Sequence, residues 1–181
     1  MIYLIMGVIA LLVVYVLVTY NGFVRMKNRV DELFSTMDVY LKKRWDLIPN
    51  IVEKVKGYAK YEKSTLSEII KLRNSAYDNM SSDEKIKTNQ QLSKGTTKIM
   101  ALAEQYPDLK ANKNFKDLST QLTKIEDEIV NSRKYYNGTV REFNDKVQMF
   151  PSNIVANIFG YKTKAMFEAN EEERKNVKVS L

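Results

Sequence analysis

The first twenty residues of the chain, MIYLIMGVIALLVVYVLVTY, contain no Lys, Arg, Asp, Glu, Pro or Gln, and the first charged side chain is Arg25. At about 1.5 Å of rise per residue, a helix over residues 1–20 is about 30 Å long, which matches the hydrocarbon core of a bilayer. The segment therefore predicts a transmembrane anchor over residues 1–22, and the rest of the chain must fold beside a membrane.

The same segment does not read as a cleaved secretory signal. It lacks a basic start, and residues 18–21 offer no small-x-small cleavage site. Basic residues follow the apolar segment on its C-terminal side only, beginning with Arg25, Lys27 and Arg29. The positive-inside rule then predicts a single-pass protein of the cell membrane with its N-terminus outside and its large domain in the cytoplasm.

Composition limits the chemistry that the remaining chain can perform. The 181 residues contain no Cys and no His, which excludes disulfides, thiol nucleophiles and the commonest general base and metal ligand. We therefore expect no catalytic residues, no metal and no cofactor. Residues 22–60 carry nine Lys or Arg against five Asp or Glu. This excess beside the anchor favours an anionic membrane surface as a partner, and nucleic acid is not expected to be one.

Apolar residues recur every three or four positions through most of the chain, which predicts an all-α fold. The first stripe runs from Val30 to Ala76, with Pro49 inside it as a kink or an interruption. Ser81 and Glu84 have the spacing of a capping box that starts a second helix, and this helix ends at Pro107.

A third stripe runs from Phe115 to Phe150 and meets Pro151. Three amphipathic segments with short links predict an antiparallel helical bundle over residues 23–150, although a coiled-coil dimer would use the same stripes. Residues 151–181 are expected to form short C-terminal helices and a tail. One helix covers 152–159 and is closed by Gly160, and a second covers 163–173.

Several motifs resemble those of LemA family proteins, in order and at compatible spacing over essentially the whole chain. They are Asp38-Val39-Tyr40-Leu41-Lys42-Lys43-Arg44-Trp45-Asp46-Leu47-Ile48-Pro49-Asn50-Ile51-Val52, Val55-Lys56-Gly57-Tyr58-Ala59, Tyr106-Pro107-Asp108-Leu109-Lys110-Ala111-Asn112, Arg133-Lys134-Tyr135-Tyr136-Asn137 and Phe150-Pro151-Ser152-Asn153-Ile154-Val155-Ala156. The resemblance implies a bacterial protein with an N-terminal membrane anchor and a soluble antiparallel helical bundle. It brings no catalytic residues, and Trp45 stands where the family pattern tends toward Tyr.

The polar residues of interest gather in two stretches. We select them as one structural cluster or partner site: Asp38, Arg44, Asp46, Asn50, Arg133, Tyr136 and Asn137. Arg44 falls near the apolar stripe, which predicts a buried or half-buried partner for a carboxylate, whereas a docking site centred on it is the alternative. Acidic residues of the third segment would form a solvated face, with one carboxylate turned toward Arg133 or Arg44.

These features predict a role and not a reaction. The first hypothesis is a non-enzymatic interaction or scaffold module at the bacterial inner membrane, which presents a helical surface to other membrane or envelope proteins. An extracytoplasmic sensor or ligand-binding bundle in envelope stress signalling is the alternative. A third possibility is an enzyme that uses only Asp, Glu, Lys, Tyr or Ser, and a homo-oligomer stays open.

Overall fold

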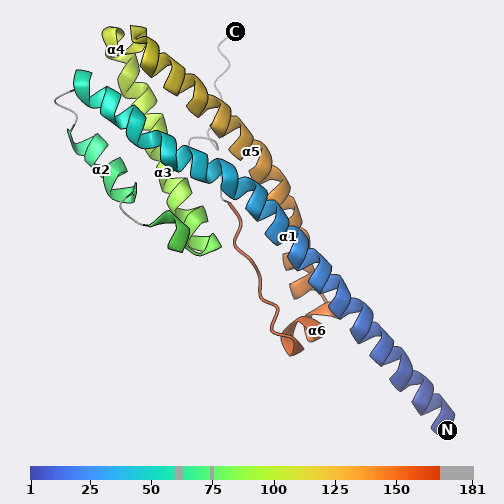
Figure 1. The fold of residues 1–181 in the computed structure, drawn as a ribbon. Coiled ribbons are helices and arrows are strands. Elements are labelled where there is room, and N and C mark those ends of the chain that lie inside the picture. Colours follow the sequence, from blue (N-terminus) through green and yellow to red (C-terminus); the bar gives the residue numbers. More distant parts are fainter. Residues whose placement is uncertain (60–62, 74–75, 168–181) are drawn as a thin grey trace, which may run out of the picture. The chain divides into compact units, whose positions relative to one another are not determined.

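The computed structural model describes residues 1–59, 63–73 and 76–167 (Figure 1). Its elements in chain order are α1 (Ile2–Tyr58), α2 (Lys63–Arg73), the 3₁₀ helix η1 (Tyr77–Asn79), α3 (Ser82–Glu104), α4 (Pro107–Ala111), α5 (Lys113–Gln148) and α6 (Ser152–Ile158). No β-strand occurs in those ranges, so the predicted all-α fold is confirmed. The described chain falls into two compact units, which we treat separately. Unit 1 is Met1–Thr36 with Lys134–Met166, and unit 2 is residues 37–133 together with Phe167.

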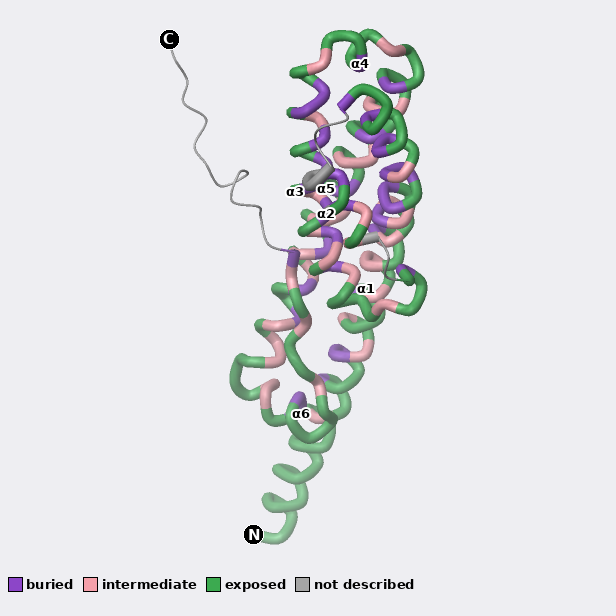
Figure 2. The backbone as a smooth tube through the Cα atoms, turned by 90° about the vertical axis from the view of Figure 1, so that its left-hand side faces the viewer, coloured by how far each residue is buried: buried purple, intermediate pink, exposed green. Residues whose placement is uncertain are grey.

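Unit 1 begins with the apolar half of α1, which is the one helix in the described chain that is long and apolar enough to cross a membrane. Its side chains are exposed almost throughout up to Val18, as the tube in Figure 2 shows. Burial begins at Thr19 and is complete at Phe23, whose ring packs against Phe143 with centroids 6.1 Å apart. The predicted anchor therefore enters the folded unit without a linker, because the same helix continues into the core.

The segment after α6 completes unit 1 by running back along α1 and α5. Gly160 takes a left-handed φ of 71° and closes α6, as the sequence predicts. The Asn144 side chain accepts from the Lys164 backbone N–H at 2.8 Å and donates to the Lys164 carbonyl at 3.0 Å. Lys164 also places its ammonium group 2.6 Å from Asp31 of α1. These contacts fix an irregular segment whose backbone otherwise lacks helical hydrogen bonds.

Unit 2 is built from α2, α3 and α4 with one half of α1 and one half of α5. Asp38 contacts Lys85 and Arg44 contacts Asn89, so α1 and α3 run in the same direction. Arg44 also contacts Glu126, and Tyr58 accepts from Asn112, so α5 runs opposite to α1. Because α2 runs back between α1 and α3 in the chain, the helices α1, α2, α3 and α5 alternate in direction. The predicted antiparallel bundle is confirmed, with α2 as an additional member.

The core of unit 2 contains most of the predicted apolar stripes. Each element of this unit contributes aliphatic or aromatic side chains that are less than 10% exposed, among them Met37, Leu41, Trp45, Ile48, Ile51, Val52, Val55, Leu66, Ile69, Tyr77, Ile86, Leu92, Ile99, Leu102, Leu109, Phe115, Leu122 and Ile129. The capping box that begins α3 is present in full, with Ser81 and Glu84 each accepting from the other's backbone N–H.

Two predicted helix boundaries are wrong. The stripe predicts a first helix that continues to Ala76 with a kink or an interruption at Pro49, whereas α1 is uninterrupted at Pro49 and ends at Tyr58. Proline removes one N–H donor, and the buried side chains of Ile48 and Ile51 hold the turns on either side of it. The second error is the helix expected over 163–173: residues 163–167 are not helical, because their backbone bonds to side chains of α5 instead. Residues 168–173 and the expected tail lie outside the described chain.

Candidate functional site

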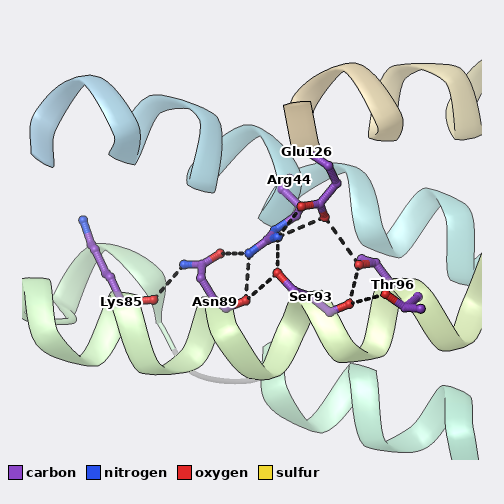
Figure 3. A network of polar contacts seen from close by, with 7 residues as sticks. Arg44, Lys85, Asn89, Ser93, Thr96 and Glu126 are labelled. Carbon is purple, nitrogen blue, oxygen red and sulfur yellow. Dashed lines mark hydrogen bonds and ion pairs between the residues drawn. The ribbon is translucent and has the colours of Figure 1, made fainter. Parts of the chain in front are cut away.

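Arg44 is the largest fully buried side chain of the described chain, with 1% of its surface exposed. It lies on α1 at a position that the helical stripe turns inward, between Leu41 and Ile48. A buried guanidinium loses its hydration, so it is stable there only if charged or polar groups replace the water. The residues that do so come from α3 and α5 (Figure 3).

The guanidinium reaches both neighbouring helices. Its Nη1 donates to Ser93 Oγ at 2.6 Å and to both carboxylate oxygens of Glu126 at 2.9 and 2.8 Å. Its Nη2 donates to the carbonyl and to the side-chain oxygen of Asn89 at 2.8 and 2.9 Å. The expectation that Arg44 is a buried partner for a carboxylate therefore agrees with the geometry, and that carboxylate is Glu126.

The polar partners are themselves held in place along α3. The Asn89 amide donates to the Lys85 carbonyl at 2.9 Å, which leaves its oxygen facing Arg44. Thr96 Oγ1 donates to the Ser93 carbonyl at 2.8 Å and lies 3.4 Å from Glu126. A preorganised acceptor set of this kind gives the three helices one register, because sliding any of them by one turn would leave a buried charge unpaired.

A second polar cluster surrounds Asp38, which lies almost two turns before Arg44 on α1. Its carboxylate accepts from the Tyr77 hydroxyl at 2.5 Å and from the Lys85 ammonium at 2.6 Å. Tyr77 is buried, and its ring lies 5.1 Å from the ring of Trp45. Burial and the hydrogen bond to Asp38 raise the pKa of the Tyr77 phenol, because both oppose formation of a phenolate.

An open groove of about 350 Å³ lies between α3 and α5, next to the Arg44 network. Hydroxyl, charged and apolar side chains line it together: Ser93, Thr96, Thr97, Met100, Leu122, Thr123, Glu126, Asp127, Ile129, Val130 and Arg133. Val130 is 48% exposed although it is apolar. No group of three or more Asp, Glu, His or Cys side chains close enough to hold a metal ion occurs among the described residues.

The structure does not gather the seven selected residues into one cluster. Asp38 and Arg44 belong to the two adjoining networks described above, and Arg133 lines the groove. Asp46 forms an exposed ion pair with Lys42 at 2.8 Å. The exposed Asn50 lines a separate shallow hollow with residues of α1 and α5.

The last two of the seven belong to unit 1. Tyr136 is buried there, where its hydroxyl donates to the Ala165 carbonyl at 3.0 Å and its ring packs against Phe34. Asn137 is half-buried beside it on α5.

Sequence reasoning missed the partners that α3 supplies. Asn89 and Thr96 fall on the same face as the buried Ile86 and Ile99, at spacings of three and seven residues. Polar residues at core positions of a stripe are a usable signal, because a buried amide or hydroxyl requires a partner. Tyr77 carries no such signal, since it lies in a short 3₁₀ turn outside any stripe.

Comparisons with known proteins place the chain in a family. The sequence profile described as LemA family matches residues 33–181. Protein LemA of Metamycoplasma hominis is 31% identical over 162 residues, which cover 88% of this chain and 74% of that protein.

More distant similarity extends to magnetosome proteins. Magnetosome protein MamQ 2 of Paramagnetospirillum magneticum is 24% identical over 84% of this chain, and Magnetosome protein MamQ of Magnetospirillum gryphiswaldense is 23% identical over 81%. The matches span 65% and 63% of these two relatives, just under two thirds of their length. The profile match and the similarity to protein LemA cover most of the sequence, and the chain belongs to the LemA family.

Proposed function

We propose that this chain is a membrane-anchored interaction module that acts by binding other membrane or envelope proteins, and not by catalysis. The observation that carries the proposal is the continuity of α1. Its exposed apolar half spans the length of a bilayer core, and Phe23 is already fully buried in unit 1 three residues after Tyr20. Unit 1, fixed to a bilayer in this way, holds a defined orientation toward neighbours in the same membrane.

The pairing of the charged side chains inside unit 2 supports binding over catalysis. Arg44 and Glu126 form an ion pair, and Asp38 is held between Tyr77 and Lys85. Groups paired in this manner specify a fold, whereas a catalytic acid or base must be free to exchange a proton with a substrate.

The groove between α3 and α5 is the surface that we assign to the partner. It combines exposed apolar area at Val130 with hydroxyl groups and both signs of charge, a mixture suited to a protein segment. Val39, on α1 of the same unit, is 53% exposed and does not line the groove. The pair Val130→Asp and Val39→Asp therefore places the same charge on two equally exposed valines.

The test is purification of the full-length protein from its own membranes in mild detergent, followed by mass spectrometry, with residues 1–24 as an anchor-only control. We expect a near-stoichiometric partner with the wild type and with Val39→Asp, and its loss with Val130→Asp. Retention of the partner by both variants would show that the binding surface lies outside the groove. Recovery of the chain alone would contradict the interaction module itself.

Orientation is a separate part of the proposal. The basic residues that follow the apolar segment support a cytoplasmic bundle by the positive-inside rule. Ser82, exposed at the start of α3, is a suitable reporter position because Ser82→Cys introduces the only thiol. Labelling of this variant by a membrane-impermeant maleimide in intact cells would instead place the bundle outside, as the sensor hypothesis requires.

A further inference from the structure

Residues 147–161, which we name the apolar foot, contain no charged residue, although charged residues make up 28% of the chain. The foot covers the end of α5, the turn through Pro151 and all of α6. Its large apolar side chains are strongly exposed: Met149 by 63%, Phe150 by 79%, Ile154 by 51%, Ile158 by 67% and Phe159 by 48%. Soluble proteins rarely leave such a group of neighbouring apolar side chains in water, so the foot requires a covering surface.

The foot is two-sided. Val155 and Ala156 of α6 are buried against the rest of unit 1, whereas Ile154 and Ile158 lie one turn apart on the outer face. The predicted stripe of the third helix placed Phe150 in the core, but the chain turns at Pro151 and leaves this ring outside. The exposed side chains of Phe150, Ile154 and Ile158 are therefore not part of the core of unit 1.

The foot lies at the level where the apolar half of α1 ends. The ring of Phe159 is 4.6 Å from the ring of Tyr20, the last residue of the apolar segment, and Tyr161 stacks on Phe23 at 4.8 Å. Both views show α6 beside α1 (Figures 1 and 2). Aromatic residues concentrate at the boundary between hydrocarbon and headgroups, which is the position that this ring cluster would occupy.

Cationic side chains surround the foot. Arg25, Lys146 and Lys162 belong to unit 1, and in the described part of the chain none of the three forms an ion pair with a carboxylate. The ammonium group of Lys146 lies over the Phe23 ring and against Gly22 of α1. Burial and the positive charge of Arg25 lower the pKa of Lys146. Asp145 is the only acidic residue between 145 and 164. The local charge thus matches an anionic surface.

We propose that the apolar foot is a second membrane contact of this chain, with Phe150, Ile154 and Ile158 seated among the headgroups of the anionic bilayer that holds the anchor. The inference rests on the membrane anchoring in the proposed function and adds an interfacial contact to it. An interfacial element of this kind combines an apolar face with flanking Lys and Arg, and its binding grows with anionic lipid. The bilayer is the occupant because the foot is continuous with the end of the anchor.

The test uses the full-length protein in vesicles of phosphatidylcholine with phosphatidylglycerol. Because the chain has no Cys, Ile158→Cys carries one environment-sensitive fluorophore in the foot. Tyr135→Cys is the matched control, since Tyr135 is equally exposed, belongs to unit 1 and lies about 20 Å back along α5. Lipids with a nitroxide high on the acyl chain report contact with the bilayer, and iodide in solution reports contact with water.

We expect the nitroxide lipids to lower the fluorescence at position 158 by about twofold and to leave position 135 nearly unchanged. In phosphatidylcholine alone the quenching at 158 should weaken, and equal quenching would overturn the role of the cations. A label at 158 that iodide quenches and lipid does not, in protein that resists carbonate extraction, overturns the foot and leaves the anchor. Shielding from both quenchers that disappears on dilution with lipid would assign the foot to a second copy and overturn the inference. Extraction of the protein by carbonate refutes the anchor and the foot together.

Discussion

Removing the carboxylate of Glu126 should destabilise unit 2 more than removing the guanidinium that it binds. Glu126→Ala leaves Arg44, only 1% exposed, with hydrogen bonds to Ser93 and Asn89 but with no counter-charge. Arg44→Met instead removes the buried charge, and the remaining carboxylate can hydrate because 29% of its side chain is exposed. The two halves of one ion pair therefore contribute unequally.

The expected magnitudes follow from this asymmetry. Breaking a buried pair so that one charge is left alone costs about 3–5 kcal/mol, and partial access of water at Glu126 favours the lower end. Arg44→Met leaves the buried Asn89 oxygen without its donor, which costs about 1–3 kcal/mol. The double variant should cost less than the sum of the single ones, since the unpaired charge is absent from it.

Trp45 provides the assay. It is the only Trp, it is 4% exposed and it lies in unit 2 next to Arg44, so its fluorescence during urea denaturation in detergent reports the unfolding of this unit. Asp46→Ala is the control, because it removes an exposed carboxylate from the pair with Lys42 and should change the free energy of unfolding by less than about 0.5 kcal/mol. The reasoning from burial is refuted if Glu126→Ala lowers the free energy of unfolding by no more than Asp46→Ala does. It is also refuted if Glu126→Ala lowers that free energy by less than Arg44→Met does.

Other positions give outcomes that can be measured on the same solubilised protein. Gly138→Ala should stabilise α5 by about 1 kcal/mol, because the added Cβ meets nothing within 4 Å. Gly95→Ala should stabilise α3 less or destabilise it, because its Cβ would lie 2.9 Å from the side chain of Ile69. Equal shifts of Tm for the two variants in circular dichroism would contradict this contrast. Because the pKa of Tyr77 is raised from 10.0, the contribution of Tyr77 to stability is present below pH 10.0 and is lost as the pH rises above it. Tyr77→Phe should therefore reduce the loss of unfolding free energy at alkaline pH, measured by urea titrations followed by Trp fluorescence. An unchanged dependence of that free energy on pH would refute the role of Tyr77. Burial raises the pKa of Asp31, but the hydrogen bonds and charges of Lys164 and Lys27 lower it by more, so the net pKa is below 3.8. The contribution of Asp31 to stability is therefore present above pH 3.8 and is lost as the pH falls through the lowered pKa. Lys164→Met should raise the pKa of Asp31 in a carbon-13 NMR titration, and an unchanged titration would show that the ion pair is not formed in solution.

The helical stripes could be predicted from the sequence because each long helix buries one face at a period of 3.6 residues. The inward position of Arg44 followed from the same periodicity. Periodicity could not reveal that α1 ends at Tyr58, since Ala59, Leu66 and Ile69 continue the helical spacing into α2 and are all buried. A turn that preserves the helical spacing of apolar residues cannot be detected from that spacing alone.

The partner of Arg44 and the exposure of Phe150 could not be predicted from the sequence, because both depend on how the helices pack against one another. Several carboxylates of α5 are within a few residues of one another, and only the register between α1 and α5 selects Glu126. Phe150 continues the spacing of Phe143 and Val147, yet it is exposed because the helix ends two residues earlier. Sequence spacing describes a face of a helix but not where the neighbouring helix stops covering it.

The uninterrupted passage of α1 from its apolar half into unit 1 has a consequence for how neighbours are met. A domain on a flexible linker samples many heights and directions above a membrane, and it loses that freedom when it associates. Here Phe23 is packed three residues after Tyr20, so the height and the rotation of unit 1 follow those of the helix in the bilayer. A membrane neighbour would thus encounter one face at one height, and much of the orientational entropy of association is lost before the two proteins touch. Inserting one residue between Tyr20 and Phe23 would turn that face by about 100°.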